Sequence, residues 1–434
     1  MVSPGPFCLR RLLSCPGNKE TGLNGQLIGD DPFFLKGNCM AKNKVSIVKT
    51  NPRPNYAAIR KAVEKALELI GGVDDLIKPG EKVLLNPSWV APPTEAEKGC
   101  ITQAEVTQAV ADIVRRKGAR AIIAESSAVG VDCQKVIDGS GYRLLREKGY
   151  EVVDLKKTET VMMRVPSSVV FPEIESHRIV QEADVIISLP KMKTHDQTEI
   201  TCSIKKLKGL LSDKYKRLMH QEGLFEGVVD LLSTVKPQLA IVDGIYCQEG
   251  LGPVFGKPVE MDLIVAGRDL VAVDAICGAV MGFTPEEVLL TQTAAKRGMG
   301  TAKLGEIEVL GEPVKKIQRR FLRSVEDDPV KVDGFNLIFG GITCTGCRNT
   351  VVSALVDMRN ADQLMYLPGV TVITGDPGNV PFIPAESIVT VGKCVPEGKR
   401  AKIHVKGCPP NNSIVVQAII KDRAKAKRMY ANED

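Results

Sequence analysis

The sequence predicts an α/β protein: a three-layer domain with helices on both faces of a mostly parallel sheet, followed by a smaller α/β domain. Short apolar runs such as Lys82–Leu85, Ala121–Ala124 and Asp184–Leu189 have the length and composition of buried strands. Stretches of helical period separate them, such as Gln103–Lys117, which Gly118 closes. This alternation is typical of parallel sheets buried between helices.

The other elements of the larger domain continue the same alternation. Its remaining predicted strands are Val45–Val48, Leu239–Val242 and Asp262–Val265. Its remaining predicted helices are Tyr56–Ile70, Cys133–Lys148, Leu224–Val235, Asp269–Met281 and Pro285–Arg297. The charged segment Arg320–Val332 interrupts the pattern, so we predict that the larger domain spans residues 40–325.

A smaller α/β domain is predicted over residues 332–434. Its predicted elements are the strands Phe335–Phe339, Val370–Ile373, Ile388–Val391 and Lys402–Val405 and the helices Val351–Met358 and Ser413–Lys421. Residues 1–39 are rich in Gly, Pro and Asn and show no sustained periodicity. We predict a disordered or irregular extension there, with Cys8, Cys15 and Cys39 as bystanders.

The composition argues against some classes of function and indicates a cellular compartment. Aromatic residues make up 4% of the 434 residues, which argues against a stacking platform for nucleic acid. The net charge of +6 is mild and permits an anionic substrate. There is no apolar run of about 18 residues, so no membrane span is predicted. Twelve cysteines in a chain too long to need disulfides, with no signal peptide, indicate a reducing cytoplasm.

Four cysteines in the smaller domain are candidate metal ligands. Cys344 and Cys347 form a CxxC motif between a predicted strand and a helix, and Cys394 and Cys408 each follow a later strand. Loops at strand ends converge on one edge of a parallel sheet, and nearby glycines let the backbone approach a metal. A helix N-terminus also favours the negative charge of a thiolate site.

Three interpretations of these cysteines stay open at this point. A cubane iron–sulfur cluster takes four thiolates, and it is our leading interpretation. Structural zinc also takes four thiolates, but zinc ribbons usually pair two CxxC motifs and this region has one. The third interpretation is four unrelated cysteines.

The segments CTGC (344–347), GKC (392–394) and GCPPN (407–411) together resemble the proximal-cluster motif of nickel–iron hydrogenase small subunits. The resemblance covers about 80 residues. It implies a 4Fe-4S cluster ligated by the four cysteines on a flavodoxin-like sheet. The hydrogenase large-subunit ligands have no counterpart here, so hydrogenase activity is not implied.

Polar residues follow several predicted strands of the larger domain. Asn86 follows one strand, Glu125 and Ser126 follow another, and Asp243 follows a third. The carboxyl ends of parallel strands line the crevice in which open α/β sheets bind ligands. We therefore expect these four residues to bind and orient a substrate.

Lys191, Lys193 and His195 stand on one predicted loop directly after a buried strand. Two amines and an imidazole there could clamp a carboxylate or phosphate and supply an acid or base. Glu249, in a glycine-rich segment, is a candidate carboxylate base, and Lys205 a candidate substrate ligand. The alternative for each lysine is a solvated surface position.

The segments PKMKTH (190–195), IKKLKGLL (204–211), DGI with QEGLGP (243–253) and AGRDLVAVDA (266–275) resemble the domain-of-unknown-function family 362. The resemblance covers roughly residues 40–310 and implies pairing with a cluster-binding module. Lys206 departs from the Asn expected in that family, which puts a role of this position in doubt. A looser, fold-level similarity connects the family to lactate racemase, an enzyme with a lysine-tethered nickel-pincer nucleotide.

The leading hypothesis is a cytoplasmic, oxygen-sensitive iron–sulfur enzyme of redox or lyase type that acts on a small anionic substrate. Its candidate catalytic residues are Lys191, Lys193, His195 and Glu249, and its candidate substrate ligands are Asn86, Glu125, Ser126, Asp243 and Lys205. One alternative is an electron-transfer or maturation protein that docks to a redox partner and has no substrate of its own. Another is a racemase-like enzyme with a structural cluster.

Overall fold

The computed structural model describes residues 43–326, 330–341, 343–378, 387–422 and 425–426. The extension predicted over residues 1–39 lies outside them. Residues 40–434 form one compact unit. The division of this unit into two domains between 325 and 332 stays a prediction.

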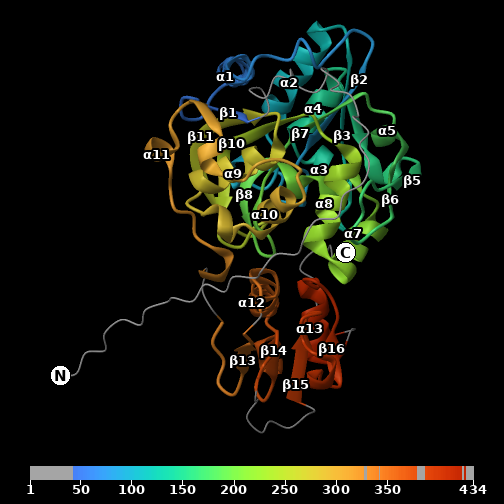
Figure 1. Ribbon diagram of the computed structural model, residues 1–434, viewed down its shortest axis with the longest axis vertical. Coiled ribbons are helices and arrows are strands. Elements are labelled where there is room, and N and C mark those ends of the chain that lie inside the picture. The colour runs from blue at the N-terminus through green and yellow to red at the C-terminus, as the bar shows by residue number, and fades with distance from the viewer. Residues whose placement is uncertain (1–42, 327–329, 342, 379–386, 423–424, 427–434) are drawn as a thin grey trace, which may run out of the picture. The chain divides into compact units, whose positions relative to one another are not determined.

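A large, mostly parallel sheet organises the longer part of the chain (Figure 1). Its strands are β1 Lys44–Lys49, β2 Lys82–Pro87, β3 Arg120–Glu125, β4 Glu151–Asp154, β7 Val185–Leu189, β8 Lys191–His195, β9 Glu199–Thr201, β10 Leu239–Glu249, β11 Lys257–Gly267 and β12 Glu308–Gly311. Their order is β12-β1-β11-β10-β7-β2-β3-β4, with β8 beside β10 and β9 beside β8. Strands β10, β7, β2, β3 and β4 are parallel neighbours, whereas β11 is antiparallel to both β1 and β10.

Alternate residues of the central strands face opposite sides of this sheet. Val83 and Leu85 of β2 pack into one apolar layer together with Ile123 of β3. Leu84 and Ile122, one position away in each strand, pack into the opposite layer. Both faces are buried, which explains why these strands read as continuous apolar runs and not as an alternating pattern.

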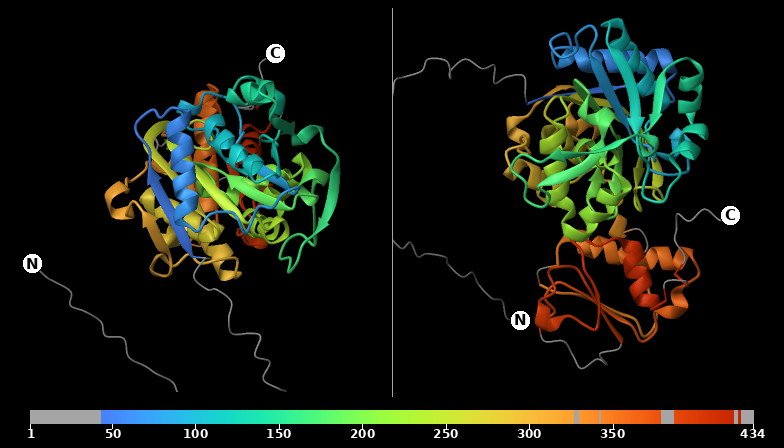
Figure 2. Two further views of the ribbon diagram at one scale, coloured as in Figure 1. Left: turned by 90° about the horizontal axis from the view of Figure 1, so that it is seen from above. Right: turned by 90° about the vertical axis from the view of Figure 1, so that its right-hand side faces the viewer.

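Helices cover both faces of the sheet (Figure 2). The layer of Val83 is completed by α1 Tyr56–Leu69, α2 Ala104–Arg116, α3 Cys133–Asp138 and α4 Gly141–Glu147. The layer of Leu84 is completed by α6 Ser203–Lys206, α7 Asp213–Glu222, α8 Leu224–Val235, α9 Leu270–Val280 and α10 Leu289–Lys296. The predicted three-layer α/β fold is confirmed. Short elements at the periphery are β5 Thr160–Arg164, β6 Glu173–His177, α5 Arg178–Gln181 and α11 Val314–Ile317.

A second, smaller sheet has the order β13-β14-β15-β16, and each neighbouring pair is parallel. Its strands are β13 Asn336–Phe339, β14 Thr371–Thr374, β15 Ile388–Val391 and β16 Ile403–Val405. Helices α12 Thr345–Asn360 and α13 Asn412–Ile420 contribute to its apolar core. Among the described residues, no helix has the length and apolarity needed to cross a membrane.

Two predicted loops are strands. The segment Lys191–His195 is β8, and it pairs with both β10 and β9. The glycine-rich segment after Asp243 continues β10 as far as Glu249, where it pairs with β11. Polar residues alone predict a loop, but pairing with neighbouring strands satisfies the backbone and decides the conformation here.

Candidate functional site

Asn86 is the last residue but one of β2 and Glu125 the last of β3, and the two side chains are in contact. The Asn86 Nδ2 amide donates a hydrogen bond of 2.7 Å to Glu125 Oε2. Lys206 donates to Asn86 Oδ1 at 2.8 Å and forms an ion pair with Glu125. Burial raises the pKa of Glu125 and lowers that of Lys206. A side chain at Gly209 would collide with the Glu125 carboxylate, since its Cβ would lie 1.7 Å from Oε1.

Lys191 and Asp243 form a fully buried ion pair between β8 and β10, with Nζ 2.7 Å from Oδ2. The Asp243 carboxylate also accepts the backbone N–H groups of Gln103 at 2.7 Å and Ile245 at 3.1 Å. Every one of these contacts is internal. The arrangement supports a structural role for both residues, which hold the carboxyl ends of the strands in place.

Lys193, next on the same face of β8, is buried without a carboxylate partner among its hydrogen bonds. Its amine donates to the carbonyl oxygens of Cys100 at 2.7 Å and Pro253 at 2.9 Å. Burial, together with the positive charge of Lys205, lowers the pKa of Lys193 to about 7. An amine with this pKa changes charge near neutral pH and can serve as an acid or base.

His195 ends β8 and is buried beside Asp196. The Gln197 N–H donates to His195 Nδ1 at 2.9 Å, while Asp196 Oδ1 lies 2.8 Å from the same nitrogen. Burial and the charge of Lys205 lower the pKa of His195 to about 4. The ring is therefore neutral at pH 7, with Nδ1 in contact with both the Asp196 carboxylate and the Gln197 N–H.

Two further lysines belong to this region, and the sequence did not single them out. Lys208 of the short 3-10 helix Leu207–Leu210 lies 2.7 Å from His220 Nε2, and burial lowers the pKa of both groups well below their ordinary values. Lys216 of α7 donates to Ser126 Oγ at 2.6 Å and to the carbonyl oxygen of Ser127 at 2.7 Å. The Ser126 hydroxyl, predicted to bind a substrate, is thus hydrogen-bonded to a lysine of the protein itself.

Lys205 acts electrostatically on four of these groups. Its charge contributes to lowering the pKa of Lys193, His195, Lys208 and His220. We call these five residues the amine cluster. Burial lowers the pKa of Lys205 itself to about 8. Several amines held near their neutral form next to one another make a site that attracts an anion, because an anion restores the favourable charge of each amine.

The four candidate metal ligands lie at one edge of the smaller sheet. Cys344 is the N-cap residue of α12, Cys347 lies in its first turn, and Cys394 and Cys408 follow β15 and β16. A hydrogen bond between Cys344 and Cys347 lowers the pKa of the Cys344 thiol to about 6. Both Cys394 and Cys408 act electrostatically on Cys347 and raise its pKa.

Gly392 lets the backbone after β15 pass close to the Cys347 thiol. It has a φ of +99°, and a Cβ there would lie 2.7 Å from Cys347 Sγ. Within the described segments, no three His, Cys, Asp or Glu side chains are already arranged to hold a metal ion. The donor set itself fits a cubane cluster or zinc, since four thiols converge from one helix N-terminus and two strand ends.

The loop that carries Cys408 and Pro410, here called the cysteine loop, is hydrogen-bonded to the amine cluster and to the β8–β9 hairpin. The Cys408 N–H donates to the carbonyl oxygen of His220 at 3.1 Å, and the Leu224 N–H donates to the Cys408 carbonyl at 2.7 Å. The Gln197 side-chain amide donates to the Pro410 carbonyl at 3.1 Å. Residues of the predicted smaller domain and of the β8–β9 hairpin are therefore in direct contact.

Glu249, a candidate catalytic base, is directed elsewhere. Its carboxylate pairs with Arg319 at 3.1 Å and accepts the Leu322 N–H at 3.1 Å. These partners belong to the segment that follows the larger sheet.

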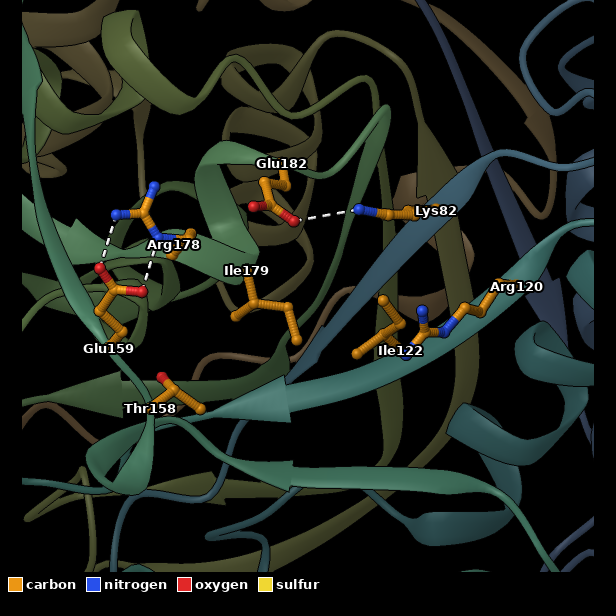
Figure 3. A pocket seen from close by; sticks show the side chains of 8 residues that line it. All are labelled: Lys82, Arg120, Ile122, Thr158, Glu159, Arg178, Ile179 and Glu182. Atoms are coloured by element: carbon orange, nitrogen blue, oxygen red, sulfur yellow. Dashed lines mark hydrogen bonds and ion pairs between the residues drawn. The ribbon is translucent and has the colours of Figure 1, made fainter.

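A separate hollow of about 290 Å³ lies at the opposite edge of the sheet (Figure 3). It is lined in part by Lys82 and Arg120, the first residues of β2 and β3. Its charged residues are all paired: Lys82 with Glu182 at 3.0 Å, Arg178 with Glu159 at 2.5 Å and Arg120 with Glu151 at 2.7 Å. Ligands of open α/β sheets bind at the carboxyl ends of the strands, so we do not assign the site to this hollow.

The fold and the site define a three-layer α/β protein whose buried amines gather at the carboxyl ends of parallel strands. A family model described as Domain of unknown function (DUF362) matches residues 83–279. The thylakoid-associated protein sll1697 of Synechocystis sp. is 31% identical over 229 residues, which span 51% of this chain and 70% of that protein. The chain belongs to this domain-of-unknown-function family.

The lactate racemase apoprotein from Thermoanaerobacterium thermosaccharolyticum is a similar solved structure. The match has 12% sequence identity and a TM-score of 0.35, and it covers 76% of this chain and 69% of that chain. A likeness of this size transfers no activity or site residue.

Proposed function

We propose that this protein is an iron–sulfur enzyme that binds a small anionic substrate at the amine cluster. The observation that carries the proposal is the pair of backbone hydrogen bonds that join Cys408 to His220 and Leu224. They place the cysteine loop directly against a group of buried amines. Buried amines beside the loop of Cys408 favour a site for an anionic substrate over an electron carrier without one.

Cys344, Cys347, Cys394 and Cys408 would hold the cluster. When bound, it would supply one-electron redox chemistry. The likeness of these cysteine segments to the proximal-cluster motif of hydrogenase small subunits supports this choice over zinc. Gly392 is compatible with a thiolate site, because the lack of a side chain lets the backbone lie close to the Cys347 thiol.

The chain's own residues would bind the substrate and move protons. Lys205 and Lys208 supply donors for an anion, and the neutral imidazole of His195 supplies a further polar group. Lys193, with a pKa of about 7, can take up or release a proton near neutral pH. Lys191, Asp243, Asn86 and Glu125 would hold these groups in position through their buried contacts.

Anaerobic purification followed by iron, sulfide and zinc analysis tests the cofactor. We expect iron and sulfide in equal amounts and their loss in Cys394→Ser. Protein that contains zinc alone would refute the iron–sulfur assignment.

Substrate binding is tested by the electron paramagnetic resonance spectrum of the reduced protein with and without added pyruvate or phosphate. We expect an anion-dependent change that Lys208→Ala abolishes. Lys61→Ala, on the exposed face of α1, is the matched control. The same change in Lys208→Ala as in the unmodified protein would contradict the proposed anion site.

We also propose that the protein works in the cytoplasm. The cysteines within the described residues carry free thiols, as a reducing compartment maintains them. The Synechocystis relative is named for its association with thylakoids, so the alternative is attachment to a membrane surface. Cell fractionation with salt washes distinguishes the two, because a surface attachment through charges is released by salt.

A further inference from the structure

The lysines around the candidate site differ in what their amines contact. Lys191 is paired with Asp243, Lys193 with two carbonyl oxygens, and Lys206 with Glu125. Lys208 and Lys216 also have close partners: His220 for the first, and two serines together with Asp213 for the second. Each of these amines is held by the protein itself.

Lys205 is the exception. Within the described part of the chain, its amine has no hydrogen-bond or ion-pair partner, although the residue is half-buried. Asp196, Lys206, Glu125 and Lys216 all act on it electrostatically. An amine kept free in such a polar surrounding is available for a ligand.

The backbone presents Lys205 and Lys208 on the same side. Lys205 lies in α6 and Lys208 in the 3-10 helix that continues it, three positions later. Residues three apart on a helix are neighbours on its surface. A ligand that reaches Lys205 therefore also meets the pair of Lys208 and His220.

We propose that Lys205 forms a Schiff base with the carbonyl group of a small carboxylate substrate, such as a 2-oxo acid, whose carboxylate is bound by Lys208 and His220. The proposal rests on the anion site of the proposed function and gives its substrate a chemical class. Lys205 would then be a catalytic nucleophile and not only a ligand.

The chemical step needs a neutral amine. Burial lowers the Lys205 pKa to about 8, so a substantial fraction is neutral at physiological pH. The Lys205 nitrogen attacks the carbonyl carbon, and the C–N bond forms as the carbonyl oxygen takes up a proton. The resulting carbinolamine loses that oxygen as water and becomes an iminium ion. One amine, one carbonyl and one proton give one iminium ion and one water, and no electrons are exchanged.

The test uses the full-length, cluster-loaded protein with glyoxylate as the probe. Borohydride reduces any iminium ion to a stable secondary amine, and peptide mapping by mass spectrometry locates the carboxymethyl group. We expect at least a tenfold preference for Lys205 over the exposed Lys61. The labelling rate should rise with pH through about 8, as the amine loses its proton.

Two variants sharpen the result. Lys205→Arg keeps the positive charge but cannot form a Schiff base, so we expect the site-specific label to disappear. Lys208→Ala keeps the nucleophile and should weaken the probe's affinity. Two results would overturn the proposal. One is labelling spread evenly over exposed lysines, and the other is a label that remains on another residue of the amine cluster in the Lys205→Arg variant. The map of the unmodified protein decides even where a variant fails to fold.

The result can be separated from the outcome of the cofactor analysis. Iron-loaded protein whose spectrum responds to anions but which gives no adduct at Lys205 overturns the Schiff base alone. Protein without iron that still gives the Lys205 adduct overturns the iron–sulfur assignment alone.

Discussion

Replacing Lys191 by Met should destabilise the protein strongly, because it removes one partner of a fully buried ion pair. The Asp243 carboxylate, with no exposed surface, would keep only the two backbone N–H donors of Gln103 and Ile245. Breaking a buried pair in this way costs about 3–5 kcal/mol. The two remaining donors place the expected loss near the lower end, at about 3 kcal/mol, since hydrogen bonds still compensate part of the charge.

The fluorescence of the single tryptophan can measure this loss of folding stability. Trp89 is fully buried against Tyr142, with ring centroids 4.8 Å apart, and follows Ser88, whose Oγ accepts the Lys191 N–H at 3.2 Å. Urea unfolding followed by Trp fluorescence should show a midpoint lower by about 1.5 M, for a slope of about 2 kcal/mol per molar urea.

A double variant and a surface variant complete the experiment. Adding Asp243→Asn to Lys191→Met removes the unpaired charge and keeps an acceptor oxygen for one of the two N–H groups, so it should recover part of the loss. Lys61→Met on the exposed face of α1 should stay within about 0.5 kcal/mol of the unmodified protein. A loss below about 1 kcal/mol in Lys191→Met, or a double variant no more stable than the single one, would refute the structural role.

Three other predictions concern the site. Gly209→Ala forces a Cβ to within 1.7 Å of Glu125, so we expect a loss of about 2–4 kcal/mol in the same urea assay. Gly392→Ala crowds Cys347 Sγ at 2.7 Å and requires a side chain at a φ of +99°, so the iron content of anaerobically purified protein should fall severalfold. The pKa of Lys193 is depressed from 10.5 to about 7 in the folded state, so the unfolded state binds more protons between these values. Stability should therefore rise with pH across this window, and the rise should be smaller in Lys193→Met.

The two glycine predictions have matched controls. Gly305 and Gly398 have open space around the position of a Cβ, so their Ala variants should be close to neutral for stability and iron content. A Gly209→Ala variant as stable as Gly305→Ala would show that the Glu125 region can rearrange. A stability profile that falls with rising pH would contradict the depressed Lys193 pKa.

The strand ends of the larger domain were predictable because continuous apolar runs in the sequence identify its buried strands. Asn86 and Glu125 follow such runs, and the structure puts them in hydrogen-bond contact. Lys191 and Asp243 were also predicted as site residues, and they form a buried ion pair with each other. Sequence shows that charges reach a sheet edge, but only the packing shows whether they face a ligand or one another.

The conformation of β8 and the roles of Lys208 and His220 could not be read from the sequence. Lys191–His195 is polar and follows a proline, which resembles a loop, yet tertiary pairing with β10 makes it a strand. The lysines of the 204–211 segment have the spacing of a solvated helix face. Their signal was the apolar residues between and after them, Ile204, Leu207, Leu210 and Leu211, which are fully buried and bring the lysines into the interior.

The β8–β9 hairpin has a consequence for how mutational data on this protein are interpreted. His195 and Glu199 are opposite one another across the hairpin, and Gln197 lies between them in the turn. The first belongs to the amine cluster, Gln197 binds the backbone of Pro410, and the charge of Cys344 contributes to raising the pKa of buried Glu199 to about 8. We therefore expect a substitution at His195, Gln197 or Glu199 to affect both the amine cluster and the candidate cysteine site, and double-mutant cycles should measure this coupling before a phenotype is attributed to either.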